Sequence, residues 1–137
     1  MKYLLLITGI FLCQYSKAQV SALGKKENQI KIYMATSGYV FQDSSIVSKY
    51  GNTVVTLEYH PNDSDTTGDI PIGYTFKNDT CVTFMFHSYL KDLPNIIKAM
   101  DKKYKRIDDT NWLDENATHE AILWKDDKGF YMCFQKL

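Results

Sequence analysis

Apolar and polar residues alternate along several stretches of the chain, and this alternation predicts strands with one buried face. The stretch NTVVTLEYHP alternates in this way and closes at Pro61. IPIGYTFK and CVTFMFHS follow, joined by a tight turn at Asn78 and Asp79, and they form the clearest hairpin in the chain. HEAILWK and FYMCFQK predict a second hairpin around the turn at 126–129. The side chains expected on buried faces are Val55, Leu57, Tyr59, Ile72, Tyr74, Phe76, Val82, Phe84, Phe86, Phe130, Met132 and Phe134.

Two stretches have helical rather than alternating spacing. Apolar residues recur at helical intervals over residues 25–37, and Gly38 follows as a stop signal, with a short extended piece expected at 39–42. A second helix is predicted over 92–107, where Asp92 fits the N-cap and Pro94 the first turn. An apolar stripe along this helix faces away from its lysines.

These elements predict an α+β fold with the order α-β-β-β-β-α-β-β. Runs of strands with few helices favour a mostly antiparallel sheet, here of about five to seven strands. Each helix has only one apolar side, so we expect both helices to pack on one face of the sheet.

The first residues have the layout of a secretory signal peptide. Lys2 precedes a short apolar run, and Ser16 and Ala18 supply small residues for cleavage. The run is too short for a membrane span, and Leu12 before Cys13 fits a lipoprotein signal poorly. We therefore expect a cleaved leader at 1–18, one globular domain at 19–137, and a protein of the periplasm or the secreted fraction.

The charge balance argues against two classes of partner. Removal of the leader lowers the basic residues from 16 to 14 while 16 acidic residues remain, which gives a net charge of −2. A nucleic-acid partner is not expected, because no basic excess is present to neutralise phosphates. No integral membrane segment is expected after the leader is removed.

Loss of the leader leaves two cysteines, Cys81 and Cys133. The alternation places both on the face opposite the buried one, so a disulfide between neighbouring strands is one reading and two free buried thiols another. A catalytic pair of Cys81 with His87 is not expected, because six residues of one strand separate them by about 20 Å.

No motif predicts a cofactor, a metal site or a catalytic centre. His119 and Glu120 begin like a zinc-protease motif, but Leu123 stands where the second histidine belongs. The loop 63–68 partly resembles a calcium loop, yet lacks the glutamate that closes one. The same loop contains Asp-Thr-Thr, which is similar to a short bacterial O-glycosylation motif and would modify Thr66.

Several aromatic residues fall outside the expected buried faces. Together they would form an interaction patch, although scattered aromatic residues are also common on protein surfaces. The patch would consist of Tyr39, Tyr50, Trp112 and Tyr131.

The sequence thus favours a small exported bacterial protein without catalytic activity that binds another protein, as an inhibitor, an immunity-type protein or an envelope accessory factor. The alternative is a carrier of a small apolar ligand between helix and sheet, in a pocket lined by Phe84, Tyr74, Met100 and Tyr104. A third reading, a small hydrolase, requires a cleft that joins a carboxylate to a histidine, which would be His60, His87 or His119.

Overall fold

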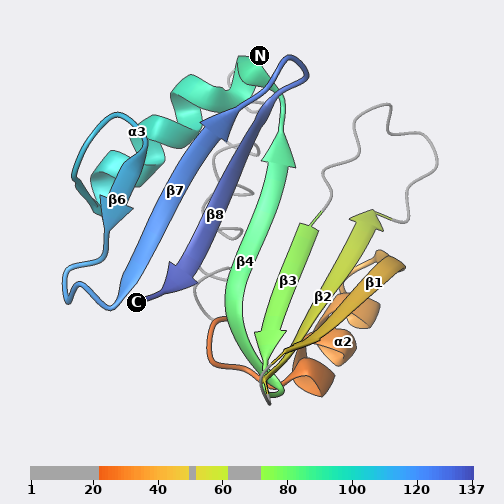
Figure 1. Cartoon of the computed structure of the whole chain (residues 1–137). Helices are drawn as coiled ribbons and strands as arrows, with labels where there is room; N and C mark the ends of the chain where they lie inside the picture. The colour runs from red at the N-terminus through yellow and green to blue at the C-terminus, as the bar shows by residue number, and fades with distance from the viewer. Residues whose placement is uncertain (1–21, 50–51, 62–71) are drawn as a thin grey trace.

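The computed structural model describes residues 22–49, 52–61 and 72–137 (Figure 1). Within these ranges the expected α+β class and element order are confirmed, with eight strands rather than five to seven. The elements are α2 (Glu27–Thr36), β1 (Tyr39–Lys49), β2 (Asn52–Pro61), β3 (Ile72–Lys77), β4 (Thr80–Ser88), a 3₁₀ turn (Leu90–Asp92), α3 (Leu93–Lys103), β5 (Lys105–Arg106), β6 (Asn111–Leu113), β7 (His119–Lys125) and β8 (Phe130–Lys136).

All eight strands belong to one antiparallel sheet with the order β1-β2-β3-β4-β8-β7-β6-β5. The order is symmetric about the central pair β4–β8, and each half of the sheet is one helix followed by four strands. Figure 1 shows α2 and α3 behind the sheet, on the same side. We call that side the helix face and the opposite side the outer face.

The core lies between the helices and the helix face. The predicted inward side chains of β2, β3 and β8 are confirmed: Val55 is partly buried against the core, and the others belong to it, with Phe76, Phe130 and Met132 fully buried. The buried Tyr74 hydroxyl donates a hydrogen bond to the sulfur of Met34 on α2, over 3.4 Å. Full burial of a large apolar side chain contributes about 1.5–3 kcal/mol, so this layer is the main source of stability.

A β-bulge changes which side chains of β4 face the core. Asn78 and Asp79 form the predicted two-residue turn, both with positive φ angles. Thr75 pairs with Thr83 and Phe76 with Cys81, so Val82 is an extra residue in the strand. The bulge turns Cys81 to the helix face, where it is fully buried, and leaves Val82 only partly buried. The prediction that Val82 is a core residue and Cys81 is not is therefore wrong.

The additional strands arise where the second helix ends early. α3 stops at Lys103 rather than at residue 107, because Tyr104 has extended backbone (φ −127°, ψ 151°) and a buried ring. The chain then forms β5 and β6. Trp112 of β6 is fully buried, and its Nε1–H donates to Oδ1 of Asp101 on α3 over 2.8 Å. This contact ties the short outer strands to the helix.

Candidate functional site

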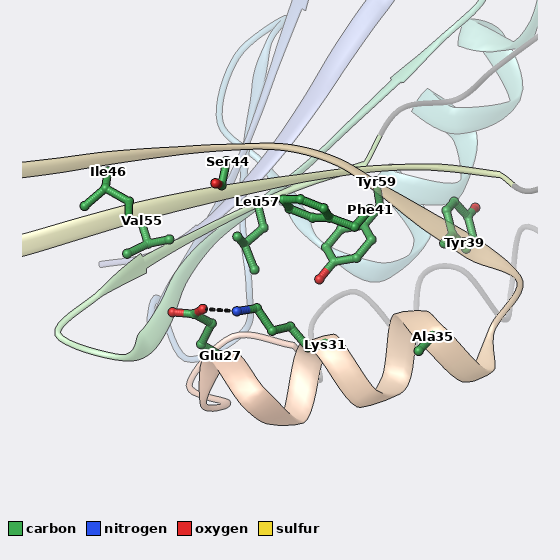
Figure 2. Close-up of a pocket in the computed structure, with 10 residues that line it drawn as sticks. All are labelled: Glu27, Lys31, Ala35, Tyr39, Phe41, Ser44, Ile46, Val55, Leu57 and Tyr59. Carbon is green, nitrogen blue, oxygen red and sulfur yellow. Dashed lines mark ion pairs between the residues drawn. The ribbon is translucent and has the colours of Figure 1, made fainter.

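A groove opens on the helix face between α2 and the first two strands (Figure 2). Its volume is about 380 Å³, near the lower end of the range for small-molecule pockets. The groove is lined by Glu27, Lys31 and Ala35 of α2, by Tyr39, Phe41, Ser44 and Ile46 of β1, and by Val55, Leu57 and Tyr59 of β2.

The strand side of the groove is apolar. Leu57 and Tyr59 are buried, whereas Phe41 is about half exposed. The rings of Phe41 and Tyr59 meet edge to face, with their centroids 5.9 Å apart. An occupant that covered Phe41 would remove an aromatic surface from water, which favours binding.

The helix side of the groove is charged. Glu27 and Lys31 form an ion pair one helical turn apart, and Figure 2 shows both side chains reaching from α2 toward the strands. The Glu27 side chain is only 24% exposed, against 50% for Lys31. Burial, and then the negative charge of Glu27, raise the pKa of Tyr59. The groove thus contains a carboxylate, paired with Lys31, opposite an apolar wall of strand residues.

β1 is an edge strand beside the groove, and it carries exposed apolar side chains on both faces. Ile46 on the helix face is 68% exposed and Val47 on the outer face is 59% exposed. Among the described strands β1 pairs only with β2, so the backbone N–H and C=O groups along its other edge have no neighbouring strand there. Such an edge can pair with a strand of another chain, and proteins commonly block exposed edges with charged residues or proline. Between Phe41 and Ser48 the strand has one charged residue, Asp43.

The sequence predicted an extended piece of only four residues where β1 has 11. A bulge between Phe41 and Asp43 shifts the alternation by one position. Phe41 and Ile46 therefore share the helix face although they are five residues apart, and a strict two-residue period does not detect them. The β-branched Ile46 and Val47 were the signal for a longer strand.

The two cysteines are free thiols on opposite faces of the sheet. Cys81 pairs with Phe76 and lies in the core, whereas Cys133 pairs with Met85 and lies on the outer face. A disulfide would require both cysteines on the same face of the sheet. The bulge in β4 instead turns Cys81 inward, away from the face of Cys133. Burial raises the pKa of each thiol to about 11, so neither is an activated thiolate at neutral pH.

The three described residues of the expected aromatic patch lie at three separate places in the fold. Trp112 is fully buried under α3 and does not belong to an exposed patch. Tyr39 lines the groove, while Tyr131 lies on the outer face between Trp124 and His87, with ring centroids 5.4 Å and 4.5 Å away. Tyr50 and Thr66 lie outside the described residues.

The three histidines lie at separate places in the sheet, and His60 and His119 each contact a carboxylate. His60 contacts Glu58 over 2.9 Å on the outer face of β2. His119 contacts Asp114 over 3.1 Å at the start of β7. His87 lies on β4.

The Asp114 carboxylate accepts hydrogen bonds that fix the conformation of the β6–β7 loop. Desolvation would raise its pKa, but hydrogen bonds from the backbone and side chains of Thr118 and His119 outweigh that cost and lower the pKa well below its usual range. His119 is one of those donors, so its contact with Asp114 is part of the hydrogen bonding that fixes the β6–β7 loop.

His87 is covered by the β7–β8 turn. Gly129 packs so closely that a Cβ there would lie 2.7 Å from Nε2 of His87. Nε2 is buried without a hydrogen-bond partner in the described part of the chain. The ring is thus closed off on that side by the turn.

Over residues 22–49, 52–61 and 72–137, no group of three or more His, Cys, Asp and Glu side chains has a geometry that would hold a metal ion. No helix in these same ranges has the length and apolar character that a membrane crossing requires. No protein-family model, curated protein sequence or solved structure matches the chain.

Proposed function

We propose that this chain is an exported, non-catalytic protein-binding domain that binds an extended segment of its partner along the edge of β1 that faces away from β2, with a side chain of that segment in the groove beside α2. The observation that carries the proposal is an edge strand with exposed apolar side chains directly beside an apolar groove. An extended peptide that adds to a sheet edge gains main-chain hydrogen bonds, and pockets for alternate side chains provide specificity. β1 supplies the edge, and the groove supplies a pocket on the helix face.

The proposal is tested by selecting 12-residue peptides from a random library on the purified protein. Ser44 and Ser45 provide a matched pair of variants, because Ser44 lines the groove and Ser45 pairs with Thr56 on the outer face. Ser44→Trp fills the groove and should weaken binding of the selected peptides by about tenfold or more. Ser45→Trp adds the same bulk elsewhere and should leave the affinity unchanged. Equal binding to both variants, or no enrichment on the wild-type protein, would contradict the proposal.

The groove volume also supports a second function, transport of a small apolar ligand. The expected pocket residues Phe84, Tyr74, Met100 and Tyr104 are instead buried in the core, so the ligand would occupy the groove beside Leu57. A carrier would bind an uncharged apolar dye such as Nile red with one saturable site in the wild-type protein and lose this binding in Ser44→Trp. A dye titration without saturation would argue against a carrier.

Export is part of the proposal and rests on the leader-like residues 1–18. Expression with the native N-terminus in a Gram-negative host should yield periplasmic protein that begins near Gln19 or Val20. Cytoplasmic protein that retains Met1 would contradict export.

A further inference from the structure

One row of paired residues runs across the eight described strands on the helix face, and the two outermost steps of its first half carry smaller side chains than the matching steps of its second half. The central pair is Phe84 on β4 and Phe134 on β8. From β1 to β5 the row is Ser44, Leu57, Tyr74, Phe84, Phe134, Ala121, Trp112 and Arg106. Because the strand order is symmetric about the centre, Leu57 and Trp112 occupy matching steps, as do Ser44 and Arg106.

In the second half of the sheet, the row fills the space beneath α3. Trp112 is fully buried and donates its indole N–H to Asp101 of that helix over 2.8 Å. The Arg106 guanidinium lies 5.5 Å from the indole centroid and 3.5 Å from the Asp101 carboxylate. A large aromatic ring and a helix carboxylate therefore close this side of the core.

In the first half, smaller side chains occupy the same two steps. Leu57 and Ser44 both line the groove under α2, and neither has the volume of an indole or a guanidinium group. The groove is thus open at the two steps of the row that the other half fills with Trp112 and Arg106. A strand added outside β1 would place one residue beside Ser44, with its side chain on the helix face, because directly paired residues have Cβ atoms about 5 Å apart.

The groove also offers a hydrogen-bond acceptor on its helix. Glu27 lines the groove with a side chain that is mostly buried, and its present partner is the half-exposed Lys31. Its carboxylate is complementary to a donor N–H, as Asp101 is to Trp112 in the other half. Hydrogen bonds to charged groups are the stronger class in proteins.

We propose that the partner segment carries a tryptophan that enters this groove beside Leu57 and directs its indole N–H to Glu27. This inference rests on the proposed function and names the side chain that the binding site selects. The partner is therefore a protein with an extended, apolar segment that contains an accessible tryptophan. It is not a segment with aliphatic side chains alone.

The test uses peptides selected on the wild-type protein. We expect each strong binder to contain a tryptophan, and its replacement by leucine to weaken binding by about tenfold or more. Glu27→Gln should weaken binding of the tryptophan peptide by severalfold and leave its phenylalanine version unchanged, since phenylalanine has no N–H to lose. Glu58→Gln, which changes a glutamate on the outer face, is the matched control and should have no effect.

A direct readout is the nuclear Overhauser effect between the peptide's indole protons and the methyl groups of Leu57, which we expect to observe. Peptides that bind at β1 and lose affinity in Ser44→Trp, but show no preference for tryptophan, would overturn this inference and leave the proposed function intact. Peptides that contain tryptophan but bind equally well to Ser44→Trp would overturn both.

Discussion

The hydrogen bond between Trp112 and Asp101 allows a quantitative prediction, and it is the internal example on which the proposed tryptophan site is based. Asp101→Ala removes the acceptor and leaves a fully buried indole N–H without a partner. An unsatisfied buried polar group costs about 1–3 kcal/mol. The ion pair to Arg106 adds little, because both side chains are 39% exposed and exposed pairs contribute about 0–1 kcal/mol. We therefore expect Asp101→Ala to lower the free energy of unfolding by about 2 kcal/mol.

A double-mutant cycle isolates the hydrogen bond from the other contacts of Asp101. In the Trp112→Phe background no N–H is left unpaired, so Asp101→Ala should cost less than about 1 kcal/mol. The assay is urea unfolding followed by far-ultraviolet circular dichroism, with the four proteins measured under the same conditions. A coupling energy of about 1–1.5 kcal/mol is expected. A coupling energy below about 0.3 kcal/mol, the usual error of additivity, would refute the hydrogen bond.

Three further predictions concern the rest of the fold. Gly129→Ala should destabilise the protein severely in thermal unfolding, because a Cβ there would lie 2.1 Å from the carbonyl oxygen of Ser88; a melting temperature within a degree of wild type would contradict the packing. The pKa of Asp114 is lower in the folded than in the unfolded state, so its stabilisation is present above about pH 4 and is lost as the pH falls further. The stability difference between wild type and Asp114→Asn should accordingly shrink below pH 4, and a difference that stays constant down to pH 2 would be the contrary result. Cys81 and Cys133 should react slowly with iodoacetamide at pH 7 in the folded protein and fully in urea, since burial raises both pKa values to about 11; mass spectrometry that finds a disulfide in the non-reduced protein would contradict the free thiols.

Much of the fold could be predicted from the sequence, because side-chain alternation and turn chemistry are local. The hairpin around Asn78 and Asp79 is an example: the turn residues tolerate positive φ, and the flanking strands alternate cleanly. The prediction of which β8 side chains point inward was also correct, since Phe130, Met132 and Phe134 are core residues. The helical spacing of apolar residues, which gives each helix one apolar side, was enough to place both helices on one face.

The errors have one main physical cause, the β-bulge. A single inserted residue reverses every later side chain relative to the sheet, and it leaves no clear mark in the sequence. In β4 the bulge moved Cys81 into the core, and in β1 it brought Phe41 and Ile46 to the same face. Trp112 was misplaced for another reason, because its polar neighbours concealed a long-range partner on α3.

The groove could not be predicted from the sequence at all. It is lined by the small side chains of Ser44 and Leu57, at the two steps where the matching half of the sheet carries Arg106 and Trp112. The strand order and the pairing register decide which residues share a step, and both are long-range properties. The exposed apolar residues of β1 were visible in the sequence, but their position beside α2 was not.

The most direct test of the account is amide hydrogen exchange of the protein with and without a peptide selected on it. A bound strand should slow exchange at alternate residues of β1, at those whose N–H groups point away from β2, because the peptide supplies their missing hydrogen-bond partners. The account predicts this alternating protection between Phe41 and Ser48 of β1. Protection on β7 and β8 with β1 unchanged would contradict it.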